Sequence, residues 1–115
     1  MIVTDKEFSR KAVKISIENN TTTGQVLTGL AITWPQATNG NLKQIKLGGT
    51  VIYNTETGGG SLTTSSLLGT TAQRTIAVGS SADLTFNFQN NVDKTANHYL
   101  GSATFDPFGN VTTLP

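Results

Sequence analysis

The chain has 115 residues and no cysteine, so it has the size of one domain and lacks disulfides, thiolate metal sites and cysteine nucleophiles. Eight basic and seven acidic residues leave a net charge of +1, which is too little to hold a nucleic-acid backbone, and we read the one dense basic stretch, residues 6–14, as a solvated terminal segment. No apolar run approaches the ~20 residues that cross a membrane as a helix, so we expect no membrane insertion.

The composition favours β-structure. Charged residues make up only 13% of the chain, and Thr, Ser, Asn and Gly take their place. Threonine suits strands because its branched Cβ packs well on a pleated surface, whereas serine, asparagine and glycine favour turns. No segment shows the 3.6-residue apolar period of a helix over helical length.

The first half of the chain alternates apolar and polar residues, which is typical of half-buried strands. Gly48 and Gly49 favour a tight hairpin in which residues 45–47 pair with residues 51–53. Pro35 ends one strand because it cannot donate to a central ladder. The predicted strands of this half are residues 11–18, 25–34, 42–47 and 50–53.

The second half begins with residues 54–71, which we interpret as a long loop with room for one short strand. Residues 106–110 are predicted to form a turn. Further strands are predicted over residues 74–78, 82–89, 98–105 and 111–114. Seven or eight short strands at roughly ten-residue spacing indicate an antiparallel β-sandwich.

Residues 1–10 precede the first firm strand and contain the apolar side chains Ile2, Val3 and Phe8. We predict that this segment is an N-terminal arm, and that a neighbouring sheet accepts it as a donated strand. The sandwich domain is then predicted to span residues 11–115.

Several motifs of the predicted strands resemble a known family. Trp34-Pro35 is followed by Leu47-Gly48-Gly49 and an aromatic-ended strand, and a Phe-rich strand follows later. This pattern resembles immunoglobulin-like sandwich domains of bacterial envelope and secreted proteins, including the outer domains of pilin-like and tight-adherence surface proteins. The resemblance implies an immunoglobulin-like fold and an extracellular or cell-surface location. Many relatives carry a cysteine near the closing strand, and pilin-like relatives begin with an apolar helix; both are absent here.

The chain offers no recognisable set of catalytic residues. His98 is the only histidine, and no Gly-x-Ser-x-Gly elbow accompanies it. One histidine without cysteine leaves too few ligands for a transition metal, whereas calcium held by loop carboxylates stays open. We therefore predict a protein that is not an enzyme, and we assign no catalytic, cofactor-binding or metal-ligating residue.

The remaining candidate sites are surface residues that can contact a partner. Trp34 ends an inward-facing stripe and is assigned to the core, whereas Tyr53 and Phe108 lie at a strand end and in a turn, where they can make exposed contacts. We predict a structural or adhesive module that associates with itself or with other surface proteins, as a subunit of a filament or pilus-like fimbrium assembled by strand pairing. The alternative is a carbohydrate-binding module whose ligands are glycans.

Overall fold

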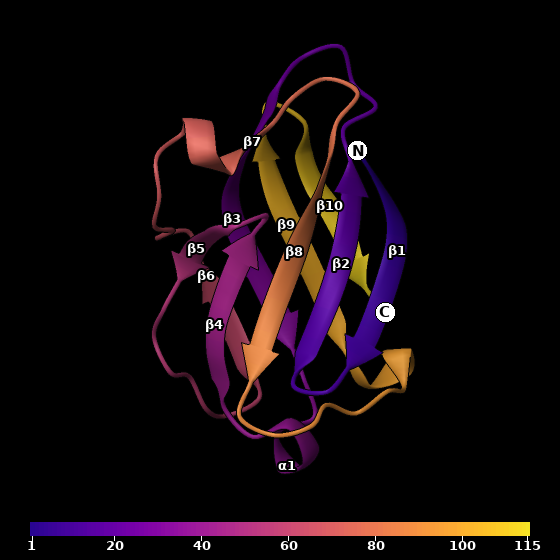
Figure 1. The fold of residues 1–115 in the computed structure, drawn as a ribbon, viewed down its shortest axis with the longest axis vertical. Helices are drawn as coiled ribbons and strands as arrows, with labels where there is room; N and C mark the ends of the chain where they lie inside the picture. Colours follow the sequence, from indigo (N-terminus) through magenta and orange to yellow (C-terminus); the bar gives the residue numbers. More distant parts are fainter.

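The computed structural model describes residues 1–115 and consists of two antiparallel sheets packed face to face (Figure 1). The first sheet contains β1 (Ile2–Ser9), β2 (Ala12–Glu18), β4 (Leu42–Leu47), β5 (Thr50–Tyr53) and β8 (Ser81–Phe88). The second contains β3 (Gln25–Thr33), β6 (Ser61–Thr64), β7 (Thr75–Ile76), β9 (Leu100–Asp106) and β10 (Gly109–Leu114). The helical pieces are α1 (Gln36–Asn39) and single 3-10 turns at Ala72–Arg74 and Ala96–His98.

The strand order confirms the predicted sandwich. The first sheet runs β1-β2-β8-β4-β5 and the second runs β10-β9-β3-β6, with β7 also paired to β3. Taken in chain order without β5, β6 and β7, these strands follow the constant-type immunoglobulin arrangement, in which strands A, B, E and D form one sheet and C, F and G form the other.

The predicted number of strands was wrong, because the chain has ten strands rather than seven or eight. The segment predicted as an arm forms β1 and pairs with β2 of its own chain. Residues 54–71, predicted as a long loop with room for one short strand, do contain such a strand, β6, which pairs with β3. The strand predicted at 74–78 is reduced to Thr75–Ile76, because a 3-10 turn precedes it and Val78 is turned out to solvent.

The core follows from the two-residue period. On β2, Val13, Ile15 and Ile17 are fully buried, while Lys14 and Ser16 between them are partly exposed. The same alternation on the other strands supplies most of a cluster of 22 buried apolar residues, which Met1, Trp34, Val92 and Tyr99 complete from outside the strands. The hairpin at Gly48 and Gly49 is also confirmed, but a bulge between Ile45 and Lys46 shifts its register, so that Leu47 pairs with Thr50 rather than with a residue of the predicted range 51–53.

A buried asparagine fixes the loops at one end of the sandwich. The Asn19 amide is completely buried and donates to the carbonyls of Thr23 and Ile76 at 2.9 and 2.8 Å. Its oxygen accepts hydrogen bonds from the backbone and the hydroxyl of Thr21. Because a buried amide without partners is costly, these bonds join the 19–23 loop firmly to β7.

The opposite end is fixed by a second buried asparagine. The Asn39 amide donates to the Tyr99 hydroxyl at 2.9 Å, and its oxygen accepts from the Asp93 backbone N–H at 2.9 Å. The Tyr99 hydroxyl in turn donates to the Asp93 carbonyl at 2.7 Å. This closed network attaches the 89–99 connection to α1, at the lower end of the molecule in Figure 1.

The hairpin that joins β1 to β2 carries local backbone strain. Ser9 pairs with Ala12, so the turn contains only Arg10 and Lys11. Arg10 adopts a φ of +55°, and it is the only residue other than glycine with a positive φ. Two-residue hairpin turns favour glycine or asparagine at such positions, because the left-handed region brings Cβ too close to the backbone.

Replacing Arg10 by glycine is expected to stabilise the protein. Relief of the positive φ should outweigh the extra chain entropy of glycine and raise the free energy of unfolding by about 0.5–1 kcal/mol, as measured by urea denaturation. Lys11→Gly is the matched control, because Lys11 has no positive φ and glycine there should lower stability. Equal effects of the two substitutions would contradict the assignment of strain to Arg10.

Candidate functional site

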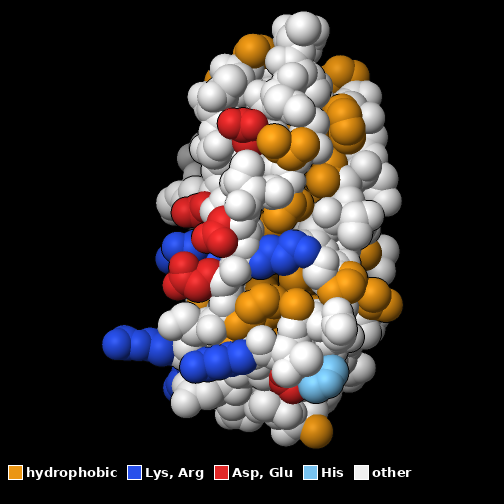
Figure 2. All heavy atoms as spheres, turned by 90° about the vertical axis from the view of Figure 1, so that its right-hand side faces the viewer, with side chains coloured by type: hydrophobic (Ala, Val, Ile, Leu, Met, Phe, Trp, Pro, Cys, Tyr) orange, Lys and Arg blue, Asp and Glu red, His pale blue; other side chains and the backbone are white.

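The three apolar residues of the predicted arm lie on β1, at the edge of the first sheet. Ile2 is 44% exposed, whereas Val3 and Phe8 are partly buried against the core. The Phe8 ring packs on the Tyr99 ring with centroids 5.1 Å apart. Figure 2, which faces the side of β1 and β10, shows apolar side chains in a strip between the two sheets. These residues therefore close one side of the sandwich.

The outer edge of β1 is a poor template for an added strand. A bulge interrupts its register between Val3 and Asp5. Lys6 lies opposite Ile15, on the face that points between the sheets, and its ammonium group donates to the carbonyl of Pro115. Bulges and inward-pointing charges on edge strands are features by which sheets avoid pairing with other chains.

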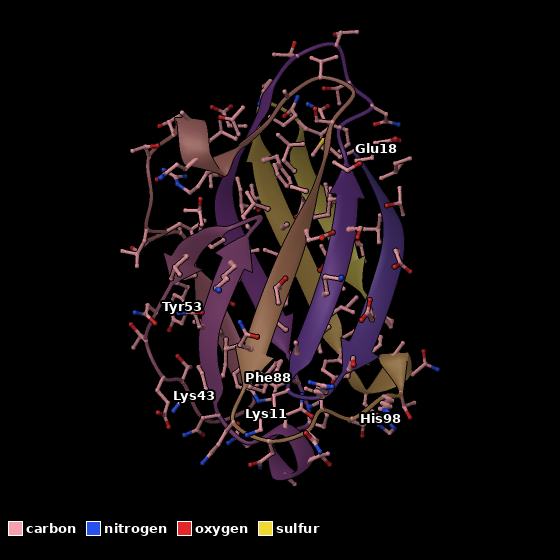
Figure 3. The ribbon with its side chains drawn as sticks, in the orientation of Figure 1. Lys11, Glu18, Lys43, Tyr53, Phe88 and His98 are labelled. Atoms are coloured by element: carbon pink, nitrogen blue, oxygen red, sulfur yellow. The ribbon has the colours of Figure 1, made fainter.

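The aromatic candidates Tyr53 and Phe108 do not share a site with each other or with β1. Tyr53 lies on β5, at the opposite edge of the first sheet (Figure 3), and is half-buried. Its hydroxyl bonds to the Thr57 hydroxyl at 2.6 Å. Phe108 lies in the turn between β9 and β10, is 46% exposed, and donates its backbone N–H to the Gln25 side chain. The five predicted contact residues are thus spread over two edges and one turn.

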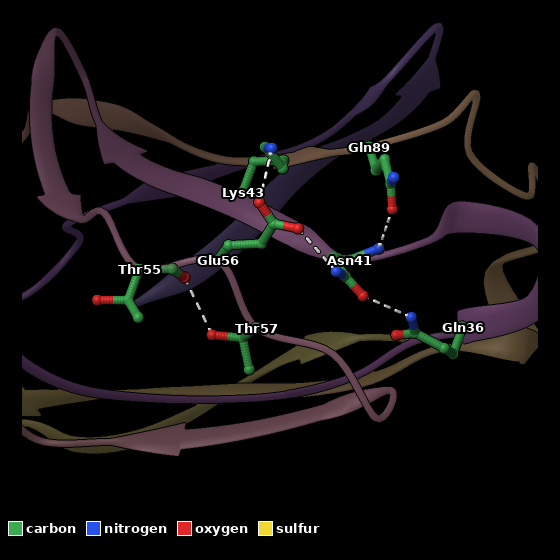
Figure 4. A network of polar contacts seen from close by, with 7 residues as sticks. All are labelled: Gln36, Asn41, Lys43, Thr55, Glu56, Thr57 and Gln89. Carbon is green, nitrogen blue, oxygen red and sulfur yellow. Dashed lines mark hydrogen bonds and ion pairs between the residues drawn. The ribbon is translucent and has the colours of Figure 1, made fainter.

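A polar network next to Tyr53 holds the 54–60 loop against β4 (Figure 4). The Glu56 carboxylate accepts from Lys43 and from the Asn41 amide, both at 2.8 Å. The Lys43 hydrogen bond, followed by the Asn41 hydrogen bond, lowers the pKa of Glu56 below its usual value. Asn41 also accepts from Gln36 at 2.8 Å, and its backbone N–H donates to Gln89. These side chains are therefore paired with one another, and their role is to hold the 54–60 loop in place.

The only histidine pairs with a carboxylate at the lower end of the sandwich (Figure 3). His98 Nδ1 lies 2.8 Å from Asp93 Oδ2. The hydrogen bond from the Thr95 backbone, and then the one from His98, lower the pKa of Asp93. Burial raises the pKa of the neighbouring Tyr99. No side-chain hydroxyl is hydrogen-bonded to the His98 ring, and no three metal-ligating side chains gather anywhere in the structure.

Charged side chains are distributed unequally between the two sheets. On the strands of the second sheet, the only charged residue is Asp106, at the end of β9. Figure 2 shows the charged side chains gathered on the side of the first sheet. The charged residues on the strands of that sheet are Asp5, Lys6, Glu7, Lys14, Glu18, Lys43, Lys46 and Asp83.

Two shallow hollows lie on the outer face of the second sheet and share Ala31, Thr63 and Ser102. Together they form a continuous depression, here called the trough, which follows β3 from Thr28 to Thr33. At a strand rise of about 3.3 Å per residue the trough is about 17 Å long. No charged residue lines it; its outward-facing side chains come from Thr28, Ala31, Thr33, Ser61, Thr63, Leu100, Ser102, Thr104 and Thr112.

The register of the strands explains the shape of the trough. Ala31 lies opposite Ser102 on β9 and Thr63 on β6. Gly29 has no side chain and Ala31 only a methyl group, so β3 leaves room at the surface between the hydroxyl-bearing side chains of β6 and β9. Hydroxyl groups both donate and accept hydrogen bonds, so the trough presents a neutral hydrogen-bonding surface.

Sequence reasoning missed the trough. The alternation placed Ala31 and Thr33 on the outer face of their strand, but it could not identify β6 and β9 as the neighbours of β3. The signal available in the sequence was the absence of charge from residues 25–34 and 98–105.

A scan against protein-family models, a search of curated proteins and a search of solved structures found no match to this chain. The resemblance to bacterial surface domains therefore stays a prediction. The helices of the structure are all too short to cross a membrane.

The lowered pKa of Asp93 predicts a contribution to stability that depends on pH. The ionised carboxylate favours the folded state, so this contribution is present near neutral pH and is lost as the pH falls below about 4, through the folded-state pKa. The unfolding free energies of the wild type and of Asp93→Asn should therefore differ at pH 5 and converge towards pH 2 in urea titrations. Parallel curves over this range would contradict the prediction.

Proposed function

We propose that this chain is a non-catalytic structural and adhesive module of the extracellular surface, and that its working surface is the trough. The resemblance carried by the Trp34-Pro35 and Leu47-Gly48-Gly49 elements supports the location and the class of protein. The uncharged lining of the trough is the observation that carries the choice of surface.

The cost of removing water from charged groups favours an uncharged surface for contact. A partner that covers charged side chains must remove their hydration, which costs free energy unless each charge finds a partner. The trough avoids this cost because the residues that line it are Thr, Ser, Ala, Gly, Leu and Ile, none of which is charged. Its hydroxyl groups still allow hydrogen bonds that orient a partner. Such a surface suits contact with an uncharged part of another surface molecule.

The alternative of a carbohydrate-binding module is favoured by the rows of hydroxyl groups, which match the hydrogen-bonding groups of a neutral glycan. In that case the ligand would lie in the trough rather than on an aromatic platform, because Tyr53 and Phe108 lie apart from each other. Cofactors and nucleic acids have no part in either proposal.

The main test introduces a charge into the trough. Beads coated with the Ala31→Glu variant should attach to bacterial cells and to one another at least about tenfold less than beads coated with the wild type, because contact would bury the new carboxylate. Thr85→Glu is the matched control, since Thr85 is half-buried on β8, a central strand of the first sheet, and should leave attachment unchanged. Equal attachment by all three proteins would overturn the proposed role of the trough.

The same variants separate the two functions on a glycan array. Specific binding to neutral glycans that is lost in Ala31→Glu and kept in Thr85→Glu would identify a carbohydrate-binding module. Glycan binding that is lost in Tyr53→Ala but kept in Ala31→Glu would indicate that the glycan binds near β5 rather than in the trough. Attachment of beads without any glycan signal supports the structural and adhesive module.

A further inference from the structure

We propose that two copies of this chain form a dimer by exchanging β1, so that β1 of each copy completes the first sheet of the other. The exchange involves the edge of the first sheet and no residue of the trough, so it stands apart from the proposed function. The exchanging segment is therefore not a free arm, as the sequence predicted, but the folded strand β1, which leaves its own sheet and pairs with the sheet of the other copy.

The packing of β1 supplies the first argument. β1 pairs with β2 alone, yet Val3 and Phe8 cover the core, so the core is exposed whenever β1 leaves. The identical strand of a second copy restores every one of these contacts. It also restores the ion pair between Glu7 on β1 and Lys14 on β2, which are 3.5 Å apart.

The hinge supplies the second argument. The turn between β1 and β2 contains only Arg10 and Lys11, and Arg10 is held at a φ of +55°. When the hinge opens, residues 2–18 become one continuous strand, and Arg10 returns to the extended region that a non-glycine residue prefers. Short hinge loops under strain favour the exchange of elements between identical chains.

The edge of β1 explains why exchange is favoured over simple addition. An added strand would have to pair with the outer side of β1, which the bulge at Val3–Asp5 and the inward-facing Lys6 make unsuitable. Exchange uses the inner side of β1, whose register with β2 is already complete from Asp5 to Ser9. A second copy is therefore the partner that this strand fits.

The absence of cysteine allows a direct test by disulfide trapping. Asp5 and Ser16 are register partners across β1 and β2, so Asp5→Cys and Ser16→Cys in one chain place two thiols opposite each other. After refolding over about a hundredfold range of concentration and oxidation, exchange predicts covalent dimers on a non-reducing gel, in a fraction that rises with concentration. Intramolecular disulfides alone at every concentration would overturn the proposal.

A matched pair controls for association without exchange. Thr104→Cys and Asn110→Cys lie opposite each other on β9 and β10, which keep their own partners in the proposed dimer. This pair should give only intramolecular disulfides, and covalent dimers from both pairs would also overturn the proposal.

The hinge gives a second readout without introduced thiols. Arg10→Gly removes the strain of the closed turn and should raise the dimer dissociation constant by about tenfold, as measured by light scattering. Ala31→Glu should dimerise like the wild type, which distinguishes failure of the exchange from failure of the trough. A dimer population that does not respond to Arg10→Gly would count against the exchange.

Discussion

The two sheets are held together by the packing of their apolar faces, and the loops, edges and outer faces are arranged around this core. Side chains alternate across a strand, so each sheet has one face that must be hidden from water. The buried cluster contains 22 apolar residues, and half of them lie on the central strands β2 and β8 of one sheet and β3 and β9 of the other. Because this core already occupies the inner faces, differences in chemistry can arise only on the outer faces, the edges and the ends.

The ends of the sandwich are organised by polar groups rather than by apolar packing. Asn19 and Asn39 are both completely buried, and each satisfies its amide through hydrogen bonds to neighbouring loops. Leaving such groups unpaired would cost more than each bond contributes, so these two side chains select one arrangement of the loops. The two ends therefore hold the connecting loops in one arrangement, and they place no constraint on the side chains of the outer faces.

The surface offers two kinds of contact, one through the outer face of the second sheet and one through the edge strand β1. The charged face of the first sheet stays hydrated, whereas the neutral trough of the second sheet can be covered without burying a charge. The side formed by β1 and β10 belongs to neither face; Figure 2 shows an apolar strip there, and Val3 and Phe8 of β1 pack against the core. Contact through the trough and exchange of β1 therefore use separate parts of one small domain.

Local sequence was enough to predict most of the strands, the inward direction of residues such as Ile15 and Phe86, and the hairpin at Gly48 and Gly49, because alternation and turn chemistry are local properties. It did not determine that residues 1–10 form β1, nor that β6 and β9 flank β3 and form the trough. Strand pairing joins residues that lie far apart in the chain. A two-residue period predicts which way a side chain points, but it does not predict which strand lies next to it. The fold of the whole chain sets those neighbours, and with them both proposed contact surfaces.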